Sequence, residues 1–270
     1  MMKKTSEEAR RRYTEYIQEY KAFIEAAQER ERTAKASFAA DGEGVALHKL
    51  ALAGDNLDVV AHYLLMNSLS VSLLGIRNEA FLNEARKSCY KAVIWLEEVV
   101  TPLIDAPFSE YEDSLAAIEG FTDESRCELV RKLGFAIDAI EEGYGENSKW
   151  KWSFVELEGR FAAVTRNLLN LKTLLAGMDP RIEGYAARLA HLALARELLQ
   201  QSADRYRQKY EMSNLRVDDI KAGINFLAAL RRLHVVLGEG EQAEVVRKKA
   251  EIWKAKMEDD LRKAEQTRKG

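Results

Sequence analysis

Apolar residues recur every three or four positions along most of the chain, which is the spacing of one face of an α-helix. The first such stripe consists of Tyr13, Tyr16, Tyr20, Phe23 and Ala27. Thr5 and Glu8 stand three residues apart before it, as in the capping box that begins many helices. No segment alternates apolar and polar residues as a half-buried strand does, so the pattern predicts an all-α protein.

Glycines, prolines and short polar side chains mark where the helices should begin and end. After the first, the expected helices span residues 45–54, 57–74, 78–100, 109–120, 122–143, 148–177, 179–211, 217–237 and 241–263. The connections between them are mostly short, so neighbouring helices should pack antiparallel. We therefore expect a single all-α domain over residues 1–270, built as an antiparallel helical repeat (an α-solenoid) or a helical bundle of about nine helices.

Charge is distributed unevenly along the sequence. The stretch from Glu97 to Glu146 contains 14 acidic and 3 basic residues, whereas the whole chain has a formal charge of −3. Residues 102–147 also carry the shortest expected helices, so we expect an internal boundary or a flexible acidic insert there. The last residues, 264–270, should form a frayed tail.

The longest unbroken apolar pattern runs through residues 149–177 and ends at Met178. Its members alternate at three and four residues and are Phe154, Leu157, Phe161, Val164, Leu168, Leu171, Leu175 and Met178. This is the a/d spacing of a heptad seam, which predicts one continuous central helix ending at Gly177.

Polar and aromatic residues accompany this seam and are the candidate partner-binding residues. They are Glu156, Arg160, Asn167 and Asn170, on the stripe beside the seam, together with Trp150 and Trp152, at the helix entry. The stripe is either a solvated helix side or the polar wall of a groove. Two asparagines favour the groove, because better helix formers would serve on a plain surface.

Recognisable catalytic and metal-binding patterns are missing from the sequence. The four histidines have no HExxH, HxxxH or ExxH spacing, and no phosphate-binding glycine loop or nucleophile elbow occurs. We therefore expect no cofactor, no metal and no catalytic residue. His62 and His234 lie on apolar helical faces, where a hydrogen-bonded structural histidine is the simplest interpretation.

Composition bears on where the chain acts. Cys89 and Cys127 are the only cysteines and fit a reducing compartment. The first residues are basic without a following apolar stretch, so we expect no secretory signal. The apolar run Val59–Ile76 is interrupted by polar side chains and predicts a buried helix rather than a membrane span. We expect a cytoplasmic protein without membrane insertion, and the net charge argues against nucleic-acid binding.

One stretch resembles a known family. In "VVLGEGEQAEVVRKKAEIW", Gly238 precedes Ala243 by five residues and Ala250 follows seven later. This spacing is similar to that of the tetratricopeptide repeat, in which small residues let two helices approach closely. The repeat's aromatic position is Arg247 here, and no 34-residue period runs through the chain. The resemblance implies an α-solenoid whose concave face binds peptides or partner helices.

Three functional hypotheses follow. The first is a non-catalytic adapter or scaffold that binds a protein partner through a helical groove. The second is a helical enzyme or small-ligand-binding protein with a buried polar pocket around Arg160, Asn167 and a histidine. The third is a structural homo-oligomer.

Overall fold

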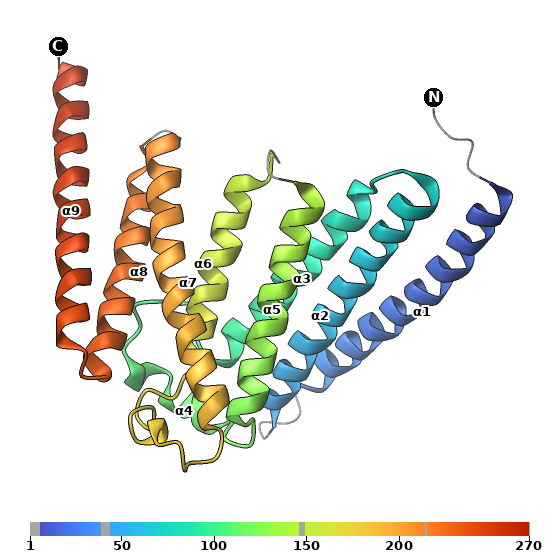
Figure 1. Cartoon of the computed structure of the whole chain (residues 1–270), viewed down its shortest axis with the longest axis horizontal. Helices are drawn as coiled ribbons and strands as arrows, with labels where there is room; N and C mark the ends of the chain where they lie inside the picture. The colour runs from blue at the N-terminus through green and yellow to red at the C-terminus, as the bar shows by residue number, and fades with distance from the viewer. Residues whose placement is uncertain (1–5, 39–43, 146–148, 214, 270) are drawn as a thin grey trace. The chain divides into compact units, whose positions relative to one another are not determined.

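The computed structural model describes residues 6–38, 44–145, 149–213 and 215–269, and within them it is all-α, as predicted. Nine α-helices are found among these residues (Figure 1). They are α1 (Glu7–Ser37), α2 (Val45–Leu69), α3 (Glu79–Val99), α4 (Glu112–Ala116), α5 (Asp123–Tyr144), α6 (Lys151–Asn167), α7 (Tyr185–Met212), α8 (Val217–Val236) and α9 (Gly240–Lys269).

Several predicted boundaries are confirmed, because local capping chemistry sets them. Asn78 caps α3, accepting the backbone N–H of Ala80 on its side-chain oxygen at 3.1 Å. Gly75 adopts the left-handed conformation, with φ of 71°, and ends the short π-helix Ser70–Leu74 that extends α2. Thr122 precedes α5 and accepts the backbone N–H of Ser125 at 3.3 Å. The α8–α9 connection likewise turns at Gly238, with φ of 74°.

The prediction of two helices over residues 45–74 is wrong. Gly54 lies inside the continuous helix α2, between the buried residues Ala53 and Leu57. A glycine in a helix interior costs only about 1 kcal/mol, and burying two apolar neighbours offsets that cost. For the first helix, Thr5 lies outside the described residues, and Ser6 is the residue whose side chain caps α1.

Two other helices begin or extend differently from the prediction. The expected helix over residues 109–120 is reduced to a 3-10 turn, Phe108–Glu110, followed by the short α4. The Asp179-Pro180 pair does not begin α7, which starts at Tyr185. The Asp179 side chain instead binds the backbone N–H of Arg181 at 3.0 Å and its guanidinium, so the acid closes a local turn. At the other end of the chain, α9 continues past Lys263 to Lys269.

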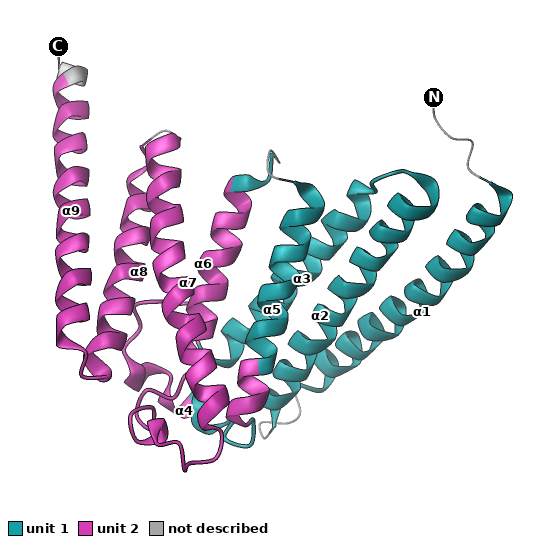
Figure 2. Ribbon diagram, in the orientation of Figure 1, with its two compact units in different colours: residues 1–100, 114–121, 128–151 teal, residues 101–113, 122–127, 152–270 magenta. Residues whose placement is uncertain are grey.

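By their contacts, the residues fall into two compact units (Figure 2). Unit 1 comprises residues 1–100, 114–121 and 128–151, and unit 2 comprises residues 101–113, 122–127 and 152–270. The acidic stretch 102–147 is therefore shared between the units and contains most of the points where the chain passes from one to the other.

Unit 1 contains α1, α2, α3 and most of α5. Part of its core lies between α1 and α2, where Ile17, Ile24, Ala27, Val59 and Met66 are buried together. Tyr13, Tyr20 and Phe23 of the predicted stripe pack against this cluster, whereas Tyr16 is exposed. By length and composition alone, the described run Val45–Leu74 could cross a membrane, and a third of its most apolar window is buried. The absence of membrane insertion stays a prediction.

Unit 2 contains nearly all of α6 together with α7, α8 and α9, and α8 contacts both α7 and α9. Glycine permits the closest approaches between these helices. A Cβ on Gly223 of α8 would lie 3.0 Å from the carbonyl oxygen of Ala203 on α7. The helices of this unit therefore pack closely enough to fix the side chains between them.

Candidate functional site

The predicted central helix is shorter than the apolar pattern indicated. Helix α6 ends at Asn167, and from Leu168 onward the heptad seam is no longer α-helical, so that Leu175 is 60% exposed. Asn170 accounts for part of this ending, because its side-chain oxygen accepts the backbone N–H groups of Lys172 and Thr173. Such local bonds compete with helix continuation, and apolar spacing does not reveal them.

The predicted polar stripe is consequently not one continuous surface. Glu156 is exposed and Arg160 is half-buried on α6, but Asn167 is fully buried and Asn170 lies beyond the helix end. A buried Asn167 is not available to a partner on the surface. The partner-binding role of Glu156 and Arg160 stays a prediction.

The tryptophans at the helix entry are half-buried. In unit 1, the guanidinium of Arg86 lies 4.1 Å from the ring centroid of Trp150, and Tyr144 packs at 6.3 Å. This contact has the geometry of a cation–π interaction. Trp150 is thus a packed ring within its unit. Trp152 belongs to unit 2 and is also only partly exposed.

A buried polar cluster lies at the C-terminal end of α6, within unit 2. Arg166 is 2% exposed and donates to the hydroxyl of Tyr111 at 2.7 Å and to the side-chain oxygen of Asn167 at 2.8 Å. The amide of Asn167 in turn donates to the carbonyl oxygens of Thr101 and Leu103 at 2.9 and 3.1 Å. These hydrogen bonds connect the segment that follows α3, at Thr101 and Leu103, to the end of α6.

The same helix end receives two further donors. Arg126 donates to the carbonyl of Leu168 at 3.2 Å, and Nε2 of His191 donates to the carbonyl of Thr165 at 2.8 Å. Burial lowers the pKa of Arg126 and Arg166, and it lowers the pKa of His191 to about 4. The last carbonyls of a helix have no partners within it and carry partial negative charge. Arg126 and His191 therefore help to complete the end of α6, whereas Arg166 is held by Tyr111 and the side chain of Asn167.

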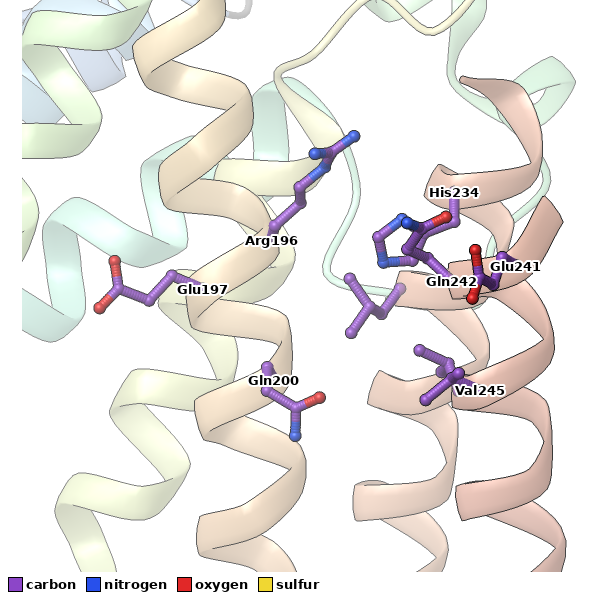
Figure 3. A pocket seen from close by; sticks show the side chains of 9 residues that line it. Arg196, Glu197, Gln200, His234, Glu241, Gln242 and Val245 are labelled. Carbon is purple, nitrogen blue, oxygen red and sulfur yellow. The ribbon is translucent and has the colours of Figure 1, made fainter. Parts of the chain in front are cut away.

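A more open site lies between α7 and α9, with α8 as its floor. This pocket has a volume of about 440 Å³ (Figure 3). It is lined by Arg196, Glu197, Gln200, Leu230, His234, Glu241, Gln242, Val245 and Val246. Arg196 and Gln200 extend from α7, and the ring of His234 lies in the gap facing them (Figure 3). An apolar floor with a few polar groups around it is the usual composition of a binding pocket.

A charged network closes one end of this α7–α9 pocket. Glu239 lies in the turn before α9. Its carboxylate accepts hydrogen bonds from Nδ1 of His234 and from a guanidinium nitrogen of Arg196, both at 2.6 Å. Burial alone would raise the pKa of Glu239, but the hydrogen bonds from His234 and Arg196 outweigh it, and the pKa lies below its ordinary value. The carboxylate therefore fixes both the imidazole and the guanidinium at the pocket edge.

A second ion pair joins α7 to α9 outside the pocket lining. Lys249 of α9 binds Asp204 of α7 at 2.8 Å, one helical turn beyond Gln200. Both bridges join α7 to α9 in the same chain direction, so the two helices run parallel on either side of α8. From Arg196 to Asp204 the distance along α7 is about 12 Å at 1.5 Å per residue. The α7 residues that line the pocket, Arg196 to Gln200, span about one helical turn.

The sequence pattern does not predict this pocket. The sequence marks the α8–α9 turn by its glycines, and Glu239 stands five residues after His234, which is a usable local signal. Arg196 stands 43 residues before Glu239 and has no such signal. Among the described residues, no group of three or more His, Cys, Asp and Glu side chains could hold a metal ion.

Comparison with known proteins places the chain in a family. No curated protein and no solved structure matches it. The model of the TP0443 family matches residues 9–261, which include every α-helix described above in whole or in large part. Since the match covers far more than half of the sequence, the chain belongs to the TP0443 family.

Proposed function

We propose that this protein is a non-catalytic adapter that binds a partner protein in the pocket between α7 and α9. The observation that carries the proposal is the pocket itself, with its apolar floor and with two ion pairs that link the helices on either side. The occupant is a short segment of another protein that places apolar side chains against this floor. Such a mode, in which side chains of one segment enter a groove between helices, recurs in peptide recognition.

Two features of the α7–α9 pocket suit this occupant. Val245 is 63% exposed and lies on the pocket wall, while Leu230 and Val246 below it are buried. A partner side chain resting on Val245 would remove apolar surface from water, worth about 25 cal/mol per Å². In addition, both walls are already fixed by ion pairs, so binding would order few groups, and little conformational entropy would be lost.

The resemblance to the tetratricopeptide repeat also supports an adapter role. It rests on the α8–α9 pair, in which Ala243 is buried and Ala250 packs against the core of unit 2. Proteins of that repeat class use successive antiparallel helices to form concave surfaces that bind peptides. We place the adapter in the cytoplasm, as the cysteine usage indicates.

The test uses the full chain to select from a displayed library of random peptides of about twelve residues. Selected peptides are then measured on wild type, on Val245→Asp and on Ile252→Asp. Ile252 is the matched control, because it lies on the same helix, is 68% exposed and does not line the pocket.

We expect that Val245→Asp weakens the affinity of the selected peptides by about tenfold or more, because peptide binding would bury the new carboxylate and remove its hydrating water. Ile252→Asp should leave their affinities unchanged. Peptides that bind both variants as well as wild type would show that the pocket is not the binding site. The same measurement on Glu156→Ala tests whether the exposed side of α6 contributes.

A further inference from the structure

A small polar cavity lies within unit 1, where α1, α2 and α3 meet. Its volume is about 10 Å³, close to the smallest space that holds one water molecule. The polar residues that line it are Gln28 and Glu31 of α1, Asp55 and Asn56 of α2, and Ser88 and Lys91 of α3. Cavities that stay dry in proteins are lined by apolar side chains, so this lining indicates a hydrated site.

Two buried side chains of the lining have hydrogen-bonding capacity to spare. Asn56 is 5% exposed, and its amide nitrogen donates to the carbonyl of Leu52 at 2.9 Å. Ser88 is 9% exposed. No residue that the structure describes bonds the side-chain oxygen of Asn56 or the hydroxyl of Ser88. Buried polar groups destabilise a protein unless a partner replaces the water that they lost on folding.

Glu31 supplies further acceptors to the same cavity. It is 6% exposed, and its two oxygens lie 2.8 Å from Nζ of Lys35 and 3.4 Å from Nζ of Lys91. Burial alone would raise the pKa of Glu31, but the two lysines outweigh it, and the pKa lies below its ordinary value. Glu31 is therefore ionised at neutral pH. A carboxylate has about four acceptor sites, so the two ion pairs leave it able to accept from another donor.

The occupant of this cavity must be small and must both donate and accept hydrogen bonds. The carboxylate of Glu31 and the oxygen of Asn56 only accept, whereas the hydroxyl of Ser88 can donate. A water molecule meets these demands, and buried waters typically make about three hydrogen bonds. A metal ion suits the site less well, because Lys35 and Lys91 already balance the charge of Glu31.

We propose that this cavity binds one water molecule, which donates to the side-chain oxygens of Glu31 and Asn56 and accepts from the hydroxyl of Ser88. Each of the three residues belongs to a different helix, so the water joins α1, α2 and α3 at one point. It is a structural ligand of unit 1, because water-mediated hydrogen bonds are nearly as favourable as direct ones.

The bound water matters most for α1, which packs chiefly on α2. Side chains near the end of α1 reach α3: the ammonium of Lys35 lies 5.0 Å from the ring centroid of Trp95, and the ring of Phe38 lies 5.9 Å from it. The water adds a hydrogen-bonded link beside these ring contacts. It therefore helps to hold the C-terminal half of α1 against α3.

A crystal structure of the full chain at about 2 Å resolution tests the proposal directly. We expect one density peak within about 3.2 Å of the Ser88 hydroxyl and of an oxygen of Asn56 or Glu31. The proposal is overturned if the cavity holds no density, or if Ser88 bonds Asn56 or Glu31 directly and closes it. Density surrounded by six or more oxygens at about 2.4 Å would also overturn it, because that geometry belongs to a cation.

A double-mutant cycle in urea unfolding tests the bridge in solution. Ser88→Ala and Asn56→Ala each remove one contact of the water, and the two side chains share no direct hydrogen bond. We expect each change alone to lower the ratio of folded to unfolded protein by about threefold or more. The double variant should lose at least about threefold less than the product of the two single effects, because the first change already breaks the bridge.

Ser70→Ala provides the matched control. Ser70 is a serine of unit 1 that is 2% exposed and does not line the cavity. It stands 14 residues after Asn56 in the sequence, so the effects of Ser70→Ala and Asn56→Ala should multiply. The same multiplication for Ser88→Ala and Asn56→Ala would show that no water couples them, and would overturn the proposal.

Discussion

Acidification should destabilise unit 2 through a single buried histidine. His191 is 2% exposed and donates from Nε2 to the carbonyl of Thr165, at the end of α6. Burial lowers the pKa of His191 from 6.5 to about 4, and the nearby Arg126 lowers it further than Asp123 raises it. At neutral pH the ring is therefore uncharged in the folded protein.

The magnitude follows from the difference between the folded and unfolded pKa values. Between pH 6.5 and 4 the unfolded chain binds a proton at His191 that the folded chain does not, so the free energy of unfolding falls as the pH falls. The full difference corresponds to about 3 kcal/mol, since one pKa unit is about 1.4 kcal/mol. About 2 kcal/mol of this loss should be present on going from neutral pH to about pH 5.

Urea unfolding of wild type and of His191→Gln at both pH values isolates this contribution. Glutamine keeps an N–H donor for Thr165 but does not titrate, and every other histidine and carboxylate contributes equally to both proteins. On going from neutral pH to about pH 5, the free energy of unfolding should fall by about 2 kcal/mol more in the wild type than in the variant. NMR titration of the imidazole protons should also show His191 titrating near pH 4. Equal losses in the two proteins, or titration near 6.5, would refute the reasoning.

Three further substitutions and one chemical treatment test the packing. Gly223→Ala should destabilise by about 1–3 kcal/mol in urea unfolding, because its Cβ would lie 3.0 Å from the Ala203 carbonyl oxygen. Gly54→Ala, where a Cβ meets nothing within 4 Å, should instead be neutral or stabilise by up to about 1 kcal/mol, and the reverse order would contradict the packing. Asn167→Ala should cost about 2–4 kcal/mol, since two loop carbonyls lose their donor, and unchanged stability would show that water replaces it. Burial raises the pKa of the Cys89 thiol to about 12, so mass spectrometry should find it unalkylated by iodoacetamide until urea unfolds the chain, and rapid labelling of the native protein would contradict its burial.

Helix positions were predictable where a cap and an apolar stripe agree. Asn78, Gly75 and Thr122 each bond or turn the backbone locally, so the residues that set these boundaries are adjacent in the sequence. The all-α class follows from the same local information, because the period of 3.6 residues needs no knowledge of the partner helices.

The failures arise where tertiary packing or a side-chain bond decides. Gly54 is a residue type that often ends a helix, but α2 continues through it because the neighbouring side chains are buried. Asn170 diverts the chain after α6 although the heptad pattern continues. The Asp179 side chain accepts the backbone N–H of Arg181 and so forms a local turn instead of capping α7. In each case one polar bond or one buried surface outweighs the propensity of a few residues.

The candidate site was predictable only in part. The α8–α9 turn and its small residues were visible, and they lie beside the pocket. The walls depend on pairs such as Arg196–Glu239 and Asp204–Lys249, whose members are more than forty residues apart. Only the packing of α7 and α9 on α8 brings them together.

The adapter role is tested most directly by calorimetric titration of the strongest selected peptide into three forms of the full chain. These are wild type, Val245→Asp and Ile252→Asp, which differ only at exposed positions of α9. We predict that the Kd rises by about tenfold or more for Val245→Asp alone, equivalent to about 1.4 kcal/mol. Equal Kd values in all three proteins would contradict binding between α7 and α9.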